Sequence, residues 1–383
     1  MGALRLGVVF GGRSGEHEVS LVSAASVLHA LDPAKYVIVP IGIEKNGRWR
    51  TGPSALAYLA GEITDVPALC YLPPDPFVRG LLVEDGHGSF RHEPLDVVFP
   101  VLHGPLGEDG CVQGLLELAS IPYVGSGVLG SAVGMDKIAQ KRLFAAAGLP
   151  VVETVSFRSE EYYTESGGII HRIETALGYP VFVKPANLGS SVGISRATGR
   201  AELHDSIALA ALYDRWVIVE RAVHNAREIE VAVLGNASPE ASVPGEIVPG
   251  NEFYDYAAKY MDGTSRCVIP AELPSDIAGR LRTLAVEAFL AAFCEGMARV
   301  DFLLSREDGA LFVNEVNTIP GFTGISMYPK LFEAAGIAYP RLLDRLIELA
   351  LEREREKAAL RRTFEPPDRW YTQGAEGSER ETR

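Results

Sequence analysis

The first hundred residues alternate between apolar strand-like runs and one helical run. Residues 4–10 (LRLGVVF) form a short apolar run that ends in the glycine turn GGRSGEHE. The segment VSLVSAASVLHAL follows with helical spacing, and YVIVPIGI and LDVVFPVL predict two further buried strands. A strand, a glycine turn, a helix and a strand are the typical opening of a parallel α/β domain. Residues 46–94 are rich in Pro and Gly, and we assign no element to them.

Two more units follow. The segment GCVQGLLELASIPYVGSGVLGSAVGMDKIAQKRLFAAAGLPVV predicts two helices and a domain boundary near residue 135. The second unit contains the strands TVSF, PVFVKP and WVIVERAV, with a helix from about Gly168 to Leu177. The third runs from REIEVAVLG through a hairpin to the helix AYPRLLDRLIELALEREREKAAL. We therefore predict domains at residues 1–135, 136–223 and 224–362, and a polar tail, 363–383, that we expect to be mobile.

The hairpin at residues 300–317 (VDFLLSREDGALFVNEVN) departs from a simple strand pattern. In strict alternation Leu311 and Val313 share one face of the second arm with Glu315 and Asn317. A carboxylate and an amide thus occupy positions where the alternating pattern predicts buried apolar side chains.

The expected turn sets the register of this hairpin. Residues 307–309 (EDG) suit a three-residue loop closed by a glycine with positive φ. That loop places Asp301 opposite Glu315 and Arg299 opposite Asn317, with all four side chains on one face. Facing carboxylates repel unless a cation lies between them, and oxygen ligands suit Mg²⁺ or Mn²⁺ with nucleotide phosphates. A charged hairpin face exposed to solvent explains this stretch equally well.

Two other segments carry candidate chemistry. In FVKPANLGSSVGIS, Lys184 ends a strand and residues 189–193 form a loop whose N–H and hydroxyl groups suit phosphate oxygens. The lysine precedes the glycines, so this is no P-loop, and a surface turn is the simpler explanation of the segment alone. Glu220 and Glu228 flank a crossing between strands that could hold an adenine edge and ribose hydroxyls. An exposed loop between strands explains this segment equally well.

Composition narrows the class of protein. The 383 residues are 47% hydrophobic and 22% charged, which is typical of a globular protein, and no apolar stretch reaches transmembrane length. A net charge of −14 argues against nucleic acid as a partner. The cysteines form no CxxC pair and indicate a reducing compartment: Cys70, Cys111, Cys267 and Cys294. We expect a cytoplasmic protein that does not bind membranes.

Seven motifs carry a family resemblance, and they occur in the family's order: GGRSGEHEVS, LHGPLGEDGCVQGLLE, GSAVGMDK, VKPANLGSSVGIS, FYDYAAKY, ARVDF and NEVNTIPGFTGIS. Through them the chain resembles the D-alanine–D-alanine ligases of the ATP-grasp superfamily over residues 4 to about 352. The resemblance implies an N-terminal parallel α/β domain that helps to bind substrate, followed by a two-part ATP-grasp fold that holds ATP between α+β units.

The same resemblance implies metal and phosphate ligands. Asp301, Glu315 and Asn317 match the family's ligands for two Mg²⁺ (or Mn²⁺) ions, with Glu315 shared between them. Lys137 and Lys184 match lysines that bind phosphate.

Further matches concern the nucleotide. Ser190 and Ser191 belong to the loop around the phosphates. Glu220 and Val223 match the hinge that binds adenine, and Glu228 matches the ribose contact.

The reacting groups are implied in the same way. Glu16, Ser190 and Tyr260 match a hydrogen-bonded trio near the first substrate, with Glu16 facing its amino group. Arg299 and the backbone of Gly321 match groups that stabilise the tetrahedral intermediate.

The remaining matches concern substrate carboxylates. His103 matches a residue near the carboxylate of the first substrate, and Lys259 and Ser326 match groups that bind that of the second. The chain departs from the family at Ala257, where an acid is usual, and at Arg221, where a lysine is common.

The resemblance implies ATP-dependent ligation of two D-alanine molecules through a D-alanyl phosphate, for peptidoglycan precursor synthesis, by an enzyme that we expect to be a homodimer. A D-alanine–D-lactate (depsipeptide) ligase is the alternative. The segment EFYDYAAKYMDGTSR lacks the histidine of ester-forming relatives, which favours the dipeptide. We expect residues 187–193 and 249–262 to be mobile without ligand. The N-terminal glycine turn GGRSGE lacks the G-x-G-x-x-G spacing that an NAD-dependent dehydrogenase would require. A nucleotide sensor without catalytic activity is disfavoured because the polar set is intact: Arg299, Asp301, Glu315 and Asn317.

Overall fold

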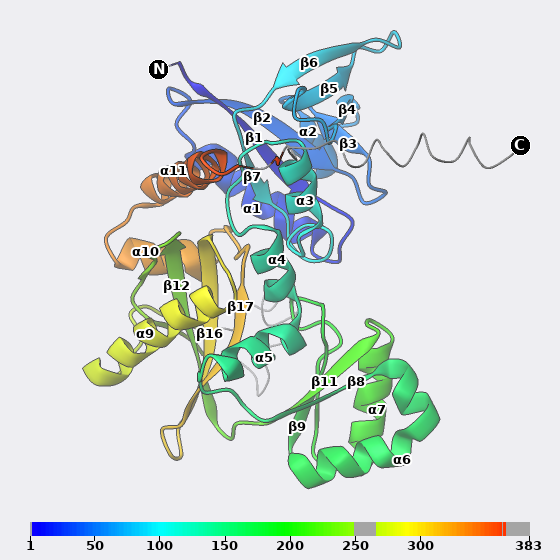
Figure 1. The fold of residues 1–383 in the computed structure, drawn as a ribbon, viewed down its shortest axis with the longest axis vertical. Helices are drawn as coiled ribbons and strands as arrows, with labels where there is room; N and C mark the ends of the chain where they lie inside the picture. The colour runs from blue at the N-terminus through cyan, green and yellow to red at the C-terminus, as the bar shows by residue number, and fades with distance from the viewer. Residues whose placement is uncertain (1, 249–265, 362, 365–383) are drawn as a thin grey trace, which may run out of the picture.

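A computed structural model describes residues 2–248, 266–361 and 363–364. The predicted mobile segment 249–262 and nearly all of the predicted tail therefore lie outside the described residues. Three sheets form the structure, one in each of three consecutive units (Figure 1). Within the described ranges, no helix is long and apolar enough to span a bilayer.

The N-terminal unit contains a seven-stranded sheet in the order β6-β5-β4-β3-β2-β1-β7. The predicted parallel opening is confirmed, because β1 pairs in parallel with both β2 and β7. The sheet as a whole is mixed, since residues 46–94 add antiparallel strands to one edge. The elements are β1 (Leu4–Gly11), α1 (His17–Ala30), β2 (Tyr36–Ile43), β3 (Trp49–Thr51), α2 (Ala55–Leu59), β4 (Ala68–Tyr71), β5 (Gly80–Glu84), β6 (Phe90–Pro94) and β7 (Val97–Val101).

The central unit is an antiparallel sheet, ordered β10-β9-β11-β8, with α6 and α7 packed in its core. Helix α6 begins at Ser159 with Glu160 and Glu161 in its first turn, well before the predicted start near Gly168. Acidic side chains at a helix N-terminus interact favourably with the helix dipole. The elements that lead to this unit and form it are α3 (Cys111–Leu118), α4 (Val128–Met135), α5 (Lys137–Ala146), β8 (Thr154–Arg158), α6 (Ser159–Ala176), β9 (Val181–Pro185), β10 (Ser195–Ala197), α7 (Arg200–Ala211) and β11 (Trp216–Arg221).

The C-terminal unit is an antiparallel sheet, ordered β15-β14-β12-β16-β17, with β13 paired to β12. Helix α9 packs in the core on one face of this sheet. The elements are β12 (Ala226–Gly235), β13 (Glu240–Ala241), β14 (Gly245–Val248), β15 (Arg266–Val268), α9 (Ser275–Ala291), β16 (Gly296–Ser305), β17 (Leu311–Asn317), α10 (Met327–Ala334) and α11 (Tyr339–Ala358).

Helix α11, near the C-terminus, packs against the N-terminal sheet. Its buried residues Leu342, Leu343 and Leu346 lie in the same apolar cluster as Val8 and Phe99 of the N-terminal sheet. In Figure 1 the helix lies beside that sheet and above the rest of the C-terminal unit. The N-terminal and C-terminal units therefore share one core, while the domain limits given above remain a prediction.

The β16–β17 hairpin has a longer loop than expected. The backbone N–H of Ser305 donates to the carbonyl of Ala310 at 2.9 Å, so the loop comprises the four residues 306–309 and not three. Gly309 has the expected positive φ, 71°. A loop of this length alone would move Glu315 out of line with Asp301.

A β-bulge restores the predicted register. Phe302 pairs with Val313 and Asp301 pairs with Glu315, so Asn314 is the extra residue on β17. The predicted pairing of Asp301 with Glu315 is thus correct, although the loop that was expected to produce it is wrong.

The bulge also corrects the predicted face pattern. Leu311, Val313 and Val316 are buried in the core that contains α9, whereas Glu315 and Asn317 line a cleft. The polar pair therefore does not share a face with Leu311 and Val313, because one extra residue reverses the alternation of a strand.

Candidate active site

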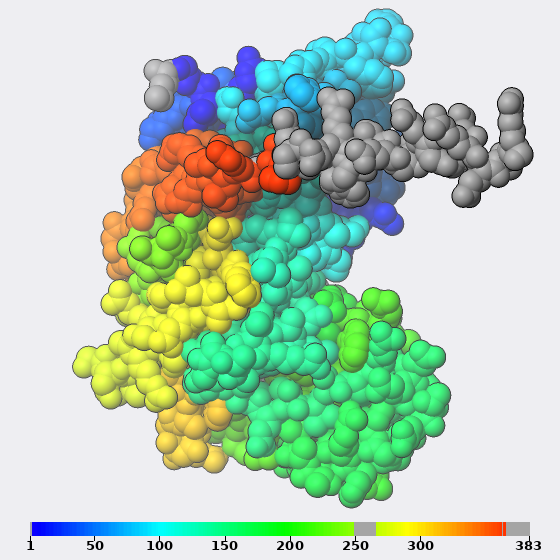
Figure 2. All heavy atoms as spheres, viewed as in Figure 1, coloured from blue at the N-terminus to red at the C-terminus, as the bar shows by residue number. Residues whose placement is uncertain are grey.

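A cleft of about 250 Å³ is lined by residues from all three units. In Figure 2 a hollow separates the central unit from the N-terminal unit on the right of the view. The lining combines loops that follow β1 and β7, the β9–β10 loop, the end of β11, and the strands β12, β16 and β17.

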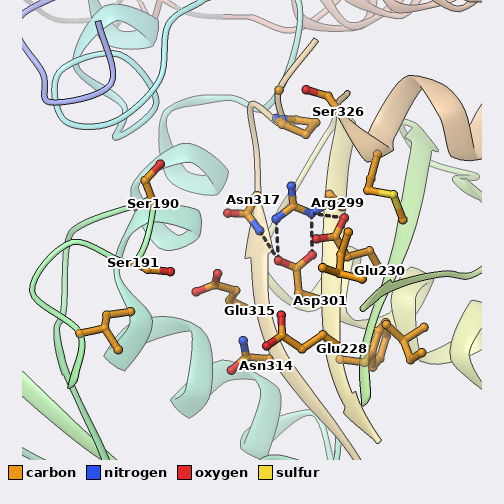
Figure 3. A pocket seen from close by; sticks show the side chains of 18 of the residues that line it. Ser190, Ser191, Glu228, Glu230, Arg299, Asp301, Asn314, Glu315, Asn317 and Ser326 are labelled. Atoms are coloured by element: carbon orange, nitrogen blue, oxygen red, sulfur yellow. Dashed lines mark hydrogen bonds and ion pairs between the residues drawn. The ribbon is translucent and has the colours of Figure 1, made fainter. Parts of the chain in front are cut away.

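The first side, called here the acidic wall, comprises Glu228, Glu230, Arg299, Asp301 and Glu315 (Figure 3). Arg299 donates to Asp301 through two bonds, Nε to Oδ1 and Nη2 to Oδ2, each 2.7 Å long. Its Nε also lies 3.2 Å from Oε2 of Glu230. Burial lowers the pKa of Arg299, but the charges of Asp301 and Glu230 outweigh it and raise that pKa. Arg299 is therefore a fixed, permanently charged guanidinium.

Asn317 and Glu315 complete the predicted ligand set. Asn317 Nδ2 donates to Asp301 Oδ2 at 3.0 Å, and Glu315 Oε2 lies 3.8 Å from Lys137 Nζ. Two carboxylates and an amide offer only hard oxygen donors, which fits Mg²⁺ or Mn²⁺. Among the described residues, no three His, Cys, Asp or Glu side chains converge on a ready-made metal cage. An ion bound here would need further oxygen ligands, as Mg²⁺ held between carboxylates and phosphates does.

Opposite the acidic wall lies a group called here the lysine cluster. Lys184 and Glu220 line the cleft, and Lys137 and Lys141 adjoin it without belonging to the lining. Lys184 Nζ donates to Glu220 Oε2 at 2.7 Å, and Lys141 Nζ lies 3.5 Å from Glu220 Oε1. Burial raises the pKa of Glu220, but the two ammonium groups outweigh it and hold that pKa below its usual value. Burial likewise lowers the pKa of Lys184, but Glu220 and Glu315 raise it above its ordinary value. Lys184 and Glu220 are both charged.

The β9–β10 loop lies across the cleft from the acidic wall (Figure 3). Ser190 and Ser191 have φ of 49° and 59°, in the left-handed region that non-glycine residues enter at a cost of about 1–3 kcal/mol each. Such conformations cluster at ligand-binding loops. Lys137 Nζ donates to the carbonyl of Leu188 at 2.5 Å, which ties this loop to α5. Ser190, Ser191, Lys184, Glu220, Val223 and Glu228 all line the cleft.

The N-terminal end of the cleft contains Glu16 and His103. Ser190 Oγ donates to Glu16 Oε1, so the central and N-terminal units meet at this carboxylate. His103 Nδ1–H donates to the carbonyl of Ile319 at 3.1 Å, and Nε2 lies 3.0 Å from Ser23 Oγ. Burial lowers the pKa of His103 despite the nearby Glu16 charge. The imidazole is therefore neutral near pH 7.

Residues from Ile319 to Met327 line the cleft next to His103. Ser326 Oγ accepts from the Thr323 N–H at 3.0 Å and lies 2.8 Å from Thr323 Oγ1. A Cβ on Gly321 would approach Ser326 Oγ to 2.6 Å, so the glycine leaves room for that hydroxyl. Lys259, Tyr260 and Ala257, also named from the sequence, lie outside the described residues.

The structure adds cleft residues that the sequence analysis missed. Glu108 accepts from the Gly104 N–H at 2.6 Å, and burial together with Glu16 raises the pKa of Glu108 to about 8. Glu230 pairs with Arg299, and Asn314 is the bulge residue, with a buried Oδ1 that has no hydrogen-bond donor among the described residues. Glu108 lies within the quoted motif LHGPLGEDGCVQGLLE, which was the available signal. A bulge leaves no such local signal.

Comparisons with known proteins agree along the chain. Models of two protein families match: "D-ala D-ala ligase N-terminus" over residues 5–126 and "D-ala D-ala ligase C-terminus" over residues 143–348. A D-alanine–D-alanine ligase of Chloroherpeton thalassium is 51% identical over 93% of this chain and 99% of its own length. One from Heliobacterium modesticaldum is 50% identical over 92% of this chain and 96% of its own length.

Two solved structures are also similar. The D-alanine–D-alanine ligase of Coxiella burnetii has a TM-score of 0.79 and 37% identity, over 93% of this chain and 97% of its own. The VanG D-Ala:D-Ser ligase of Enterococcus faecalis has a TM-score of 0.81 and 36% identity, over 91% of this chain and 99% of its own.

Proposed function

The chain belongs to the D-alanine–D-alanine ligase family, and on this basis we propose how its cleft joins two D-alanine molecules at the expense of ATP. The family activity serves peptidoglycan precursor synthesis, with D-alanine and ATP as substrates. The residue roles below, the metal ions and the mode of assembly are our proposals. The observation that carries them is the acidic wall facing the lysine cluster, with Glu315 and Lys137 only 3.8 Å apart.

ATP lies between these two sides. Lys137 and Lys184 contact its phosphates, and the N–H and hydroxyl groups of Ser190 and Ser191 close over them, as in other phosphate-binding nests. Glu220 and Val223 at the end of β11 hold the adenine, and Glu228 accepts from the ribose hydroxyls.

Asp301, Glu315 and Asn317 are the residues that would hold two Mg²⁺ or Mn²⁺ ions, with Glu315 contributing to both. When bound, such ions neutralise phosphate charge and align the phosphates for transfer. The bond from Arg299 to Asp301 fixes the orientation of that carboxylate, so the protein supplies a preorganised ligand.

The first D-alanine binds with its ammonium toward Glu16 and its carboxylate near the neutral His103. Its carboxylate oxygen attacks the γ-phosphorus, the bond to the β-phosphate oxygen breaks, and ADP leaves with that electron pair. The product is D-alanyl phosphate. Ser190 links Glu16 to the phosphate loop, so the substrate amino group and the phosphates are positioned together.

The second D-alanine binds its carboxylate to Ser326 and Lys259. Its neutral amine attacks the acyl carbon, and a tetrahedral oxyanion forms. Arg299 and the Gly321 N–H stabilise that oxyanion, as preorganised donors do in acyl transfer. The carbon–oxygen bond to phosphate then breaks, phosphate departs, and the amine loses its proton to give D-alanyl-D-alanine.

Selectivity for the second substrate depends on the segment that carries Tyr260. A tyrosine is uncharged at neutral pH, so it does not repel a D-alanine ammonium as a protonated histidine would. The test is product analysis with D-alanine, D-serine and D-lactate in competition near pH 7. We expect mainly D-alanyl-D-alanine, and mainly depsipeptide would refute this assignment.

We further propose a cytoplasmic homodimer, divided into domains at residues 135 and 223. The reason for the location is that the cysteines are free thiols, which is typical of a reducing compartment. Sedimentation equilibrium of the purified chain tests the dimer, and a mass equal to one chain at micromolar concentration would exclude it.

A further inference from the structure

Lys141 lies behind the cleft. Its sequence context did not indicate a functional role. It belongs to α5, and its side chain is only 5% exposed. Its Nζ lies 3.5 Å from Glu220 Oε1 and 3.4 Å from the carbonyl oxygen of Val313. Glu220 and Lys184 line the cleft, whereas Lys141 is not part of that lining. The Lys141 ammonium is turned toward Glu220 and Val313 and away from a ligand in the cleft.

Glu220 divides its two oxygens between two ammonium groups. Oε2 accepts from Lys184 at 2.7 Å, and Oε1 faces Lys141. The Glu220 side chain is 3% exposed, so solvent contributes little to its charge balance. Without a second cation, the ion pair between Lys184 and Glu220 would have no net charge and would attract phosphate weakly.

Lys141 changes that balance. Burial lowers the pKa of Lys141, and the charge of Glu220 opposes that shift. With Lys141 protonated, the cluster around Glu220 carries a net charge of +1, and the extra charge lies beside the phosphates that Lys184 is proposed to bind. One unit charge at roughly 8 Å in a partly buried site changes the affinity for a charged group about tenfold. The same ammonium reaches the carbonyl of Val313, next to the bulge, so it also connects the nucleotide hinge with the strand of Glu315.

We propose that Lys141 is a positioning residue for ATP: its ammonium neutralises Glu220 and leaves the charge of Lys184 available to the phosphates. The proposal rests on the proposed contact between Lys184 and phosphate. Lys141 itself touches neither substrate nor nucleotide.

The test measures how each variant binds nucleotides that differ in phosphate number. Adenosine, AMP and ADP are titrated as competitive inhibitors against ATP in wild type, Lys141→Met and Lys141→Arg. We expect Lys141→Met to weaken ADP and to raise KM for ATP about tenfold, and to weaken AMP less. Adenosine should weaken least, because it meets only the adenine contact proposed for Glu220. Lys141→Arg keeps the charge and should stay near wild type. Equal weakening of adenosine and ADP would indicate structural damage and overturn the proposal.

Two controls make the result decisive. Lys357 pairs with Glu117 at 2.5 Å outside the cleft lining, so Lys357→Met removes the same charge and should change no inhibition constant. If Lys141→Met does not fold, Lys141→Gln carries the same test, because its amide still donates to Val313. Full ADP affinity in whichever of the two folds overturns the proposal.

Lys184→Met separates this inference from the proposed function. If Lys184→Met leaves ADP binding intact, the phosphate role of Lys184 is wrong. If Lys184→Met weakens ADP but Lys141→Met does not, the role of Lys184 stands and only the role of Lys141 is wrong.

Discussion

The two sides of the cleft hold buried charge in opposite ways. Among the described residues, the acidic wall combines four carboxylates with one guanidinium, whereas the lysine cluster combines three ammonium groups with one carboxylate. On each side, the one residue of opposite charge holds a neighbouring side chain in place. Arg299 orients Asp301 on the acidic wall, and Glu220 orients Lys184 in the lysine cluster. The sides approach to 3.8 Å at Glu315 and Lys137.

The difference would let one cleft hold both the proposed metal ions and the phosphates of ATP. A surplus of carboxylates attracts metal ions, and a surplus of ammonium groups attracts phosphates, so a magnesium nucleotide satisfies both sides together. Substitutions on the two sides should therefore fail differently. Those on the acidic wall should alter metal dependence, and those on the lysine cluster should alter nucleotide affinity.

The largest effect is expected for Glu315→Gln. The change keeps the size of the side chain but removes the charge proposed to bridge two ions and to face Lys137. We expect kcat to fall about a thousandfold or more, with little change in thermal unfolding. Steady-state phosphate release with D-alanine measures it, and Glu348→Gln, at an exposed ion pair on α11, is the matched control. Activity within threefold of wild type would remove Glu315 from the metal site.

A smaller loss, about a hundredfold in kcat/KM for ATP, is expected for Lys184→Met. It removes a charge that is proposed to contact phosphate, and it leaves Glu220 buried beside Lys141 alone. The Mg²⁺ concentration for half-maximal rate should stay near the wild-type value, measured at saturating ATP. A large shift in that Mg²⁺ concentration would contradict the prediction that the lysine cluster does not affect metal dependence.

Asp301→Asn should sharpen the same contrast from the other side, with a loss of about tenfold to a hundredfold. The amide still accepts one bond from Arg299, while the negative charge opposite Glu315 is gone. We expect the half-saturating Mg²⁺ concentration to rise and KM for ATP at saturating Mg²⁺ to change little. A Mg²⁺ titration of the initial rate decides the point, and an unchanged midpoint would contradict the metal role.

The smallest effect is expected at the end of the cleft that belongs to neither side. A Cβ on Gly321 approaches Ser326 Oγ to 2.6 Å, whereas one on Gly324 meets nothing within 4 Å. Gly321→Ala should displace the Ser326 hydroxyl and raise KM for the second D-alanine about tenfold, with KM for ATP unchanged. Gly324→Ala is the matched control. Equal KM values for the second D-alanine in the two variants would contradict the proposed contact between Ser326 and that substrate.

Local patterns were sufficient to predict much of the acidic wall. Alternation along one hairpin brought Asp301 opposite Glu315 and Arg299 opposite Asn317, and the structure has both pairs. The agreement partly depended on compensation, since a longer loop and a bulge cancel each other. Bulges depend on packing across the sheet, and no short sequence signal marks Asn314.

Sequence reasoning found Lys137, Lys184 and Glu220 of the lysine cluster but missed Lys141. Lys141 occurs in KIAQKRLF, where a lysine on a helix is usually solvated, and only the fold brings it against Glu220. The mixed N-terminal sheet and the packing of α11 against it were missed for the same reason. Both depend on contacts between segments far apart in the chain, which local periodicity does not encode.

The central claim is that the acidic wall holds metal ions against a nucleotide fixed by the lysine cluster. Binding of Mn²⁺, followed by electron paramagnetic resonance with and without ADP, tests it most directly. We predict that wild type binds Mn²⁺ tightly only when ADP is present. Glu315→Gln should lose this binding at ADP concentrations that saturate the cleft, and Glu348→Gln should retain it. Mn²⁺ binding in Glu315→Gln equal to that of wild type would contradict the account.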